Sequence, residues 1–372
     1  MKIIKTGIAF GMFLKFLRLS IAFQAFFILS MIALSGCSNS NPGKGGARKP
    51  VSLQITAASL GGNRPSTLTF KVGTEPTAIA IDASGNIWVV NGGSADITKL
   101  NQKGALIGTY PVPSIAGFKS LSGVIAIDAP GNIWLIDNGK LVGMNQAGVA
   151  RIYGTSLKSP IVATGAGMAI DGSGNIWTAG PGGVIEASPE GVLVSGISGY
   201  PAGRNITHIA VESSGDVLAT NDLFNTVTEL SAQGGIIGKY KAGAPLIGSP
   251  SSIAVDKSGD IWLGGGLRNV VAKLSPAGAV IGTYKTGDSP RAIAIDASGN
   301  VWVVNEAGNN VTELNSSGTL IRTYPAGHNP DAIAIDASGN VWVADGGLDD
   351  VTELIGAAKG PEYFPYRGPQ WP

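Results

Sequence analysis

The sequence predicts an all-β fold, a seven-bladed β-propeller, on three observations. One thirteen-residue stretch, AIAIDASGNIWVV at residues 78–90, returns nearly unchanged at residues 292–304 and 332–344. Weaker copies extend the series to seven, with a period of about 42 residues, the usual length of one four-stranded propeller blade. Only 14% of the 372 residues are charged and 55 are glycine, which is typical of a compact β protein with many tight turns.

Each copy is marked by an acidic residue, with glycine three positions later. Trp follows six positions after the acidic residue in every copy except the fourth, which has Leu218. Successive acidic residues are 40 to 46 positions apart. They are Asp82, Asp128, Asp171, Glu212, Asp256, Asp296 and Asp336.

The sixth copy, residues 292–327, shows the expected build of one blade. Strands are predicted at 292–295, 301–304, 311–314 and 320–324. Between the first two, the Asp296 side chain is expected to cap the turn, and Gly299 to supply a positive φ angle. The first two strands are apolar on both faces, as strands sandwiched between neighbouring blades would be, so each Trp should fill the wedge between blades. The repeated residues are therefore interpreted as structural.

An N-terminal strand is expected to close the ring. The seventh copy ends at residues 351–354 without a fourth strand of its own. Residues 66–76, STLTFKVGTEP, are similar to the fourth-strand segment of the sixth copy, GTLIRTYPAGHNP. The propeller is therefore predicted to cover residues 66–354, with residues 355–372 as a tail rich in proline and aromatic residues. We expect the tail to pack along the propeller or stay unstructured; docking on a protein or glycan is the alternative.

The first residues have the layout of a secretory signal. Four basic residues precede an apolar run at 21–33, and no acidic residue occurs before Cys37. The run is short for a transmembrane anchor, which remains the alternative. It ends in Leu-Ser-Gly-Cys, which resembles the lipobox of bacterial lipoproteins, in which the cysteine becomes the lipid-bearing N-terminus. Residues 1–36 are thus predicted to be a signal peptide, Cys37 the lipidation site, and residues 37–65 a flexible tether.

This resemblance predicts a membrane-anchored protein, periplasmic or on the cell surface. Ser38 lacks the Asp that marks inner-membrane retention in that family, so an outer membrane is the expected location where the host has one. Removing residues 1–36 takes away four of the 26 basic residues and none of the 25 acidic ones, which leaves a net charge of −3. That charge argues against a nucleic-acid partner. The single cysteine excludes an intramolecular disulfide.

The repeat, an apolar strand, D-x-S-G-N and a second apolar strand with Trp, resembles the NHL-type repeat and the blade of streptogramin (virginiamycin B) lyase. The resemblance covers residues 66–354 and implies a propeller. It says little about activity, because such relatives include binding modules, lactonase-like hydrolases and lyases. Most known members have six blades, so a count of seven is a departure.

The lyase chemistry does not carry over residue by residue. The family places catalytic histidines after a proline ahead of the first strand in the last two blades, where this chain has Arg291 and Asp331. It places a Glu three residues after the Trp, where this chain has Asn305 and Asp345. The two histidines, His208 and His328, are out of register with that pattern. His208 is interpreted as a core residue, and His328 lacks an assignable catalytic partner.

Candidate binding residues lie on two rings around the predicted channel face. One ring is five residues before the repeat acid and the other is three after the Trp; both vary among copies whose framework hardly changes. A grafted binding site and plain solvent-facing loops explain this variation about equally well. The predicted ligand-binding residues are Asn91, Asp137, Arg291, Asn305, Asp331 and Asp345.

No cofactor is expected. A Ca²⁺ or Mg²⁺ ion in the channel is the one group these residues leave open, through Asp137, Asp331 and Asp345, because such cations prefer carboxylate oxygens. The favoured hypothesis is a non-catalytic, lipid-anchored, monomeric propeller that binds a protein, peptide or glycan through its channel face. The alternative is a streptogramin lyase-like or lactonase-like enzyme with a metal in the channel.

Overall fold

The computed structural model describes residues of the second of two compact units, Gly62–Pro372. The predicted signal peptide, Cys37 and most of the predicted tail lie outside the described residues. Within the described residues the regular structure is all strand, and no helix there is long and apolar enough to cross a membrane. The described ranges are 66–112, 121, 123–137, 140–153, 167–180, 182–196, 198–203, 205–242, 247–265 and 268–358.

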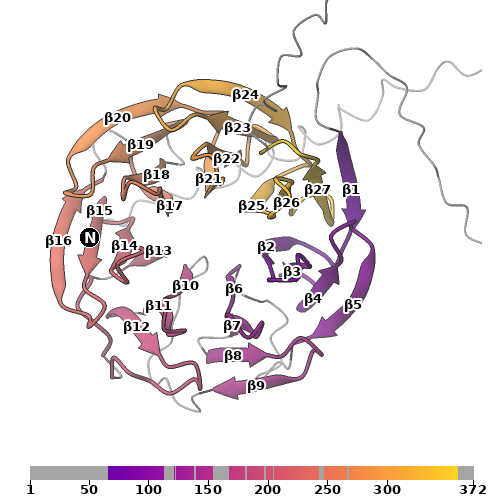
Figure 1. Cartoon of the computed structure of the whole chain (residues 1–372), viewed down its shortest axis with the longest axis horizontal. Helices are drawn as coiled ribbons and strands as arrows, with labels where there is room; N and C mark the ends of the chain where they lie inside the picture. The colour runs from indigo at the N-terminus through magenta and orange to yellow at the C-terminus, as the bar shows by residue number, and fades with distance from the viewer. Residues whose placement is uncertain are drawn as a thin grey trace, which may run out of the picture. The chain divides into compact units, whose positions relative to one another are not determined.

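Seven antiparallel sheets succeed one another around a centre (Figure 1). In six of the sheets the strands follow in chain order from the centre outward, as expected for propeller blades, and in the seventh the outermost strand is the first of the chain. Blades one to three are β2 (Pro76–Ile81), β3 (Ile87–Asn91), β4 (Asp96–Leu100) and β5 (Leu106–Pro111); β6 (Ile125–Ile127), β7 (Ile133–Asp137), β8 (Lys140–Met144) and β9 (Ala150–Tyr153); and β10 (Met168–Ile170), β11 (Ile176–Gly180) and β12 (Gly183–Ala187).

The remaining blades repeat the same order. Blades four to six are β13 (Ile206–Val211), β14 (Val217–Asn221), β15 (Thr226–Leu230) and β16 (Ile236–Lys241); β17 (Pro250–Val255), β18 (Ile261–Gly265), β19 (Val270–Leu274) and β20 (Val280–Lys285); and β21 (Pro290–Ile295), β22 (Val301–Asn305), β23 (Asn310–Leu314) and β24 (Leu320–Pro325). Blade seven is β25 (Pro330–Ile335), β26 (Val341–Asp345) and β27 (Asp350–Leu354), with β1 (Thr67–Lys71) outermost.

The innermost strands form a closed circuit. Each one contacts the innermost strand of the next blade, from β2 through β6, β10, β13, β17 and β21 to β25, and β25 contacts β2 again. The predicted seven-bladed propeller is therefore confirmed.

Tryptophan and aspartate are bonded to each other in six of the blades, as the sixth copy illustrates. Asp296 Oδ1 accepts the backbone N–H groups of Ser298 and Asn300, both at 2.9 Å, so it caps the turn as predicted. Its Oδ2 accepts the Trp302 indole N–H at 3.0 Å, a bond that the sequence did not indicate. Trp302 is fully buried against Val341 and Val343 of the next blade, which confirms the predicted wedge. On its other side Trp302 stacks on Tyr324, with ring centroids 5.2 Å apart.

The outer strand of blade seven comes from the N-terminal side of the propeller. β1 pairs antiparallel with β27, from Thr67 opposite Leu354 to Lys71 opposite Asp350. Phe70 stacks on Trp342 with ring centroids 5.7 Å apart, in the place that Tyr324 takes against Trp302 in blade six. That this strand holds the ring closed stays a prediction.

Blade three departs from the predicted four strands. After β12 the described residues of this blade form two isolated bridges, Ala187 with Leu193 and Val184 with Tyr200, in place of a fourth strand. Gly196 and Gly199 adopt φ angles of 72° and 65°, which interrupt an extended strand. Tyr200 still stacks on Trp177, so the aromatic contact survives the loss of the strand.

Candidate functional site

A β-bulge opens the first strand of five blades. The register shifts at the residue after the conserved strand start, for example between Pro290 and Ala292 and between Pro330 and Ala332. A bulged residue is left unpaired, and the bulge re-aims its side chain. The bulged residues belong to the first predicted ring; they are Thr77, Thr207, Ser251, Arg291 and Asp331.

The bulged side chains link one blade to the next. Ser251 Oγ donates to the carbonyl oxygen of Pro290 at 2.7 Å. One blade further on, Arg291 Nε donates to Asp331 Oδ1 at 2.6 Å. The structure therefore brings Arg291 and Asp331 together as predicted, and places them in a series of inter-blade contacts.

The ion pair is accessible to solvent. The Arg291 side chain is 48% exposed and that of Asp331 is 21% exposed. Burial opposes the charge on Arg291, but Asp331, with a smaller contribution from Glu306, raises the pKa of its guanidinium. The guanidinium of Arg291 therefore keeps its charge and can form charge-assisted bonds to an incoming ligand.

His208 faces the same charged region from β13. Burial, and then the positive charge of Arg291, lower the pKa of His208 to about 4. The imidazole is therefore neutral at physiological pH. Its Nδ1 is buried and has no hydrogen-bond partner among the described residues. His208 lies in a strand, as predicted. The effect of the Arg291 charge on the pKa of its imidazole was not predicted.

The second predicted ring lies inside the blades. Asn91, Asp137, Asn305 and Asp345 end the second strands of their blades, and each is at most 2% exposed. Asn305 Nδ2 donates to Asn310 Oδ1 at 2.7 Å and to Thr312 Oγ1 at 2.9 Å on the adjacent strand. Asn91 makes the equivalent bonds. These residues fasten the second strand to the third, so the structure does not join them with Arg291 and Asp331 in one open site.

Blade seven carries two carboxylates at this position. Asp345 lies opposite Asp350 in the strand register and accepts a bond from Thr352 Oγ1 at 2.6 Å. Burial, with Asp350 adding to it, raises the pKa of Asp345 to about 7. One oxygen of each carboxylate has no hydrogen-bond partner among the described residues. Asp345 therefore keeps its proton to a higher pH than an exposed carboxyl would.

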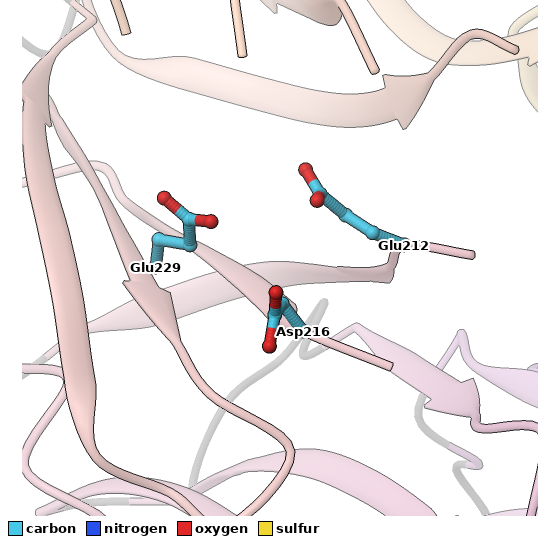
Figure 2. Close-up of side chains that lie close together, drawn as sticks. All are labelled: Glu212, Asp216 and Glu229. Atoms are coloured by element: carbon cyan, nitrogen blue, oxygen red, sulfur yellow. The ribbon is translucent and has the colours of Figure 1, made fainter. Parts of the chain in front are cut away.

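An acidic cluster lies in blade four, beside the turn that joins β13 to β14 (Figure 2). Carboxylate oxygens of Glu212, Asp216 and Glu229 come within 4.8 Å of one another, close enough to share a cation. Burial, then Glu229 and Asp216, raise the pKa of Glu212. The predicted cation residues were at the channel, whereas within the described ranges this three-carboxylate group lies at the other end of a blade. The sequence difference that could have indicated this cluster is in the fourth copy, which has Asp216 and Leu218 where the sixth copy has Asn300 and Trp302.

Exposed apolar side chains share the channel end of the blades with Arg291. Leu223 and Phe224, in the loop from β14 to β15, are 63% and 60% exposed. Leu348, in the corresponding loop of blade seven, is 49% exposed. A surface with apolar side chains near charged ones is typical of a protein-binding face.

A closed circuit of seven antiparallel sheets, with variable polar residues around one mouth, defines a β-propeller whose ligand contacts are set by loops rather than by the framework. Comparison with family models and with curated proteins finds no match.

Solved structures share the fold. A streptogramin B lyase is 17% identical with a TM-score of 0.67, over 78% of this chain and 97% of that one. The virginiamycin B lyase from Staphylococcus aureus is 19% identical with a TM-score of 0.66, over 78% and 99%. The WD40 propeller domain of Doa1 is 13% identical with a TM-score of 0.62, over 78% and 96%. The chain is thus a propeller of the kind found in the lyases, and at these identities the likeness concerns the fold alone.

Proposed function

We propose that the protein is a lipid-anchored, extracytoplasmic β-propeller that binds a protein, peptide or glycan through the channel end of its blades, without catalysis. The observation that carries the proposal is the exposed Arg291–Asp331 pair on two neighbouring bulges. Bulges are common beside functional sites, where they aim a side chain. Charge-assisted bonds to such a pair are stronger and more specific than bonds to the hydroxyls of Thr207 or Ser251.

A polypeptide is the favoured partner. Leu223 and Phe224 are adjacent and exposed, and they lie in the loop that joins β14 to β15 at the channel end of blade four. Aromatic and aliphatic side chains of this kind supply most of the energy at protein interfaces, with charged groups at the rim setting orientation. The WD40 fold relative supports the same kind of partner by analogy.

The second candidate is a lyase-like or lactonase-like enzyme. One observation favours it: the neutral imidazole of His208, with an unpaired Nδ1, lies within electrostatic reach of Arg291. A neutral histidine can act as a general base, and an arginine can stabilise a developing negative charge. The lyase histidine positions, however, hold Arg291 and Asp331.

The lipid anchor rests on the sequence around Cys37. Acylation there would tether the propeller through the segment that precedes β1. A single lipidated terminus leaves the channel end of the blades free to bind a partner.

The test is affinity capture from a detergent extract of the host envelope, with the mature chain as bait. We expect a partner that wild type retains and Leu223→Ser/Phe224→Ser loses. Leu106→Ser/Ile107→Ser, an equally apolar pair on an outer strand, is the matched control and should retain it. A partner captured equally by all three baits would place the binding surface elsewhere. Turnover of a lactone or a cyclic depsipeptide by wild type, lost in His208→Gln, would favour the enzyme instead.

A further inference from the structure

Exposed aliphatic side chains recur at one position in the blades. Among the residues that the structure describes, 16 large hydrophobic residues are exposed. Three of them, Leu223, Phe224 and Leu348, lie at the channel end of the blades, and the other 13 lie at the opposite end. Four blades present an adjacent pair as the first two residues of the outer strand, each side chain 45–63% exposed. These pairs are Leu106–Ile107, Ile236–Ile237, Val280–Ile281 and Leu320–Ile321.

A bulge projects each pair. In blade six Leu320 lies opposite Leu314 and Arg322 opposite Glu313, so Ile321 has no partner on β23. The same shift occurs in the outer strands of blades one, four and five. Ordinary alternation would send consecutive side chains to opposite faces, whereas a bulge breaks that alternation. Each of these four blades therefore exposes two consecutive aliphatic side chains at the start of its outer strand, where a regular edge strand would expose only one of the two.

The other three blades contribute five further residues at the same end, of which Ile355 follows β27. Val149 follows the turn before β9, and Leu68 is the second residue of β1. Val192 and Val194 lie in the irregular outer segment of blade three. The blades repeat around one centre (Figure 1), and these residues occupy equivalent positions at the same end of their strands. The exposed aliphatic residues thus form a rim, which we call the aliphatic rim.

The turns beside the aliphatic rim carry little charge. Each joins the third to the fourth strand position; the seven turns are residues 101–105, 145–149, 188–192, 231–235, 275–279, 315–319 and 355–358. Lys103 and Glu190 are their only charged residues. These outer turns are thus poorer in charge than ordinary solvent-facing loops, which are usually rich in Lys, Arg, Asp and Glu. The inner turns at the same end carry the repeat acids and the acidic cluster of blade four.

The N-terminal segment enters the propeller at the same end. The Ile355 N–H donates to the Ser66 carbonyl oxygen at 2.9 Å, beside the turn 355–358. Residues 37–65 precede this point. The proposed acyl anchor therefore connects to the end of the blades that carries the aliphatic rim, and the Arg291–Asp331 pair lies at the other end.

We infer that the aliphatic rim rests on a lipid bilayer. The rim runs through every blade, and a bilayer is flat and wide enough to contact all of them at once. Shallow insertion of aliphatic side chains into the interface between head groups and acyl chains needs no spanning segment. This arrangement directs the channel end away from the membrane. It shares only the lipid anchor with the proposed function, and the test below removes that anchor.

The test places a reporter on the aliphatic rim. Cys37 is the only cysteine, so the mature chain with Cys37→Ser has neither an acyl chain nor a competing thiol. Ile321→Cys in that background is labelled with an environment-sensitive NBD group and mixed with phosphatidylethanolamine–phosphatidylglycerol vesicles. We expect a blue shift, at least a twofold rise in emission, and quenching by spin-labelled acyl chains. Leu348→Cys, equally exposed at the channel end, is the matched control and should not respond.

A second measurement tests the rim as a whole. In an eightfold variant all eight residues of the four pairs are replaced by threonine, a β-branched residue that suits an outer strand. Thermal unfolding checks that the fold is kept. We expect co-flotation with vesicles to fall at least tenfold, and Leu223→Thr/Phe224→Thr/Leu348→Thr to float like the parent. Equal flotation of the eightfold variant, or an equal response at Leu348→Cys, would overturn the inference. A concentration-dependent dimer that the eightfold variant abolishes, without any vesicle response, would overturn it in favour of a second copy.

Discussion

Arg291 and Asp331 form an ion pair across the boundary between blades six and seven, at the position where Ser251 bonds to the carbonyl of Pro290 one blade earlier. The charged pair therefore takes the place of a hydroxyl-to-carbonyl link. A partly exposed ion pair contributes about 0–1 kcal/mol to stability. Stability alone thus gives little reason to keep two charges at this place, whereas recognition of a ligand does.

Arg291→Thr/Asp331→Thr separates recognition from stability. We expect a melting temperature within about 2 °C of wild type, because the ion pair is worth little and threonine already occupies this ring position at Thr207. Affinity for the captured partner should fall at least tenfold, about 1.4 kcal/mol. Calorimetry and a binding titration give the two values. Lys239→Thr removes an exposed charge from the outer strand β16 and should change neither value. Unchanged affinity in the double variant would leave the pair a structural link.

Asp345→Asn should stabilise the protein at neutral and alkaline pH. The folded-state pKa, about 7, lies above the ordinary value of 3.8. Between these two values the unfolded chain loses its proton first, so wild-type stability falls as pH rises through this window. The asparagine variant avoids that loss, and its amide can donate to Asp350 as Asn91 donates to Asp96. We expect a gain of about 1–3 kcal/mol at pH 8 that shrinks towards pH 4.

Chemical denaturation at both pH values measures this gain. The reciprocal change, Asn305→Asp in blade six, should lower stability at pH 8, because it places a carboxylate at a fully buried site. A gain for Asp345→Asn of the same size at both pH values would contradict the assigned ionisation.

Asp216→Asn should stabilise blade four. The change removes one of three neighbouring carboxylates and restores the residue found at Asn300 in blade six. Relief of like-charge repulsion is worth about 0.5–1 kcal/mol at this partly exposed site. Asp260→Asn is the matched control at the same position of blade five. It should destabilise, because Lys273 Nζ lies 2.8 Å from the Asp260 carboxylate. Changes of the same sign in both variants would mean that the carboxylate cluster is not strained.

The architecture was predictable because the repeat records its own packing. The spacing of Asp296 and Trp302 recurs where one indole fills one wedge between blades, so periodicity alone gave the number and order of blades. The second ring was not predictable. A polar residue at a strand end usually reads as solvent-facing, yet Asn305 is fully buried, since its amide satisfies two oxygen atoms of the next strand.

The bulges explain the other difference between expectation and structure. A one-residue bulge leaves no clear mark in a run such as PRAIAI. Neither the bulge at Arg291 nor the bulge that exposes Leu320 and Ile321 could therefore be predicted. Irregularity in blade three is likewise local: Gly196 and Gly199 were visible, but their φ angles depend on the surrounding contacts.

Cys37→Ser tests the predicted lipid anchor. Wild type expressed in a bacterial host should incorporate labelled palmitate and fractionate with membranes, whereas the variant should incorporate none. Fluorography after immunoprecipitation measures the incorporation. Ser38→Ala, next to the same cleavage point, is the control and should be labelled like wild type. An unlabelled wild type would rule out the lipid anchor. The apolar run at 21–33 would then be a cleaved signal peptide or a transmembrane segment.

Deletion of residues 66–73 should destabilise the propeller far more than deletion of residues 359–372. The first deletion removes β1, which pairs along the whole of β27, and leaves that strand as an open edge. It also removes Phe70, whose ring stacks on Trp342 of blade seven and lies against the turn at Gly104 of blade one. One side chain thus bridges the first and last blades. We expect a fall in melting temperature of more than about 10 °C for the first deletion, and within about 2 °C for the second, by calorimetry. Phe70→Tyr restores the residue of the other blades and should fold like wild type, while Phe70→Ala should lose about 2–4 kcal/mol. If the two deletions melt together, the pairing of β1 with β27 does not hold the ring closed.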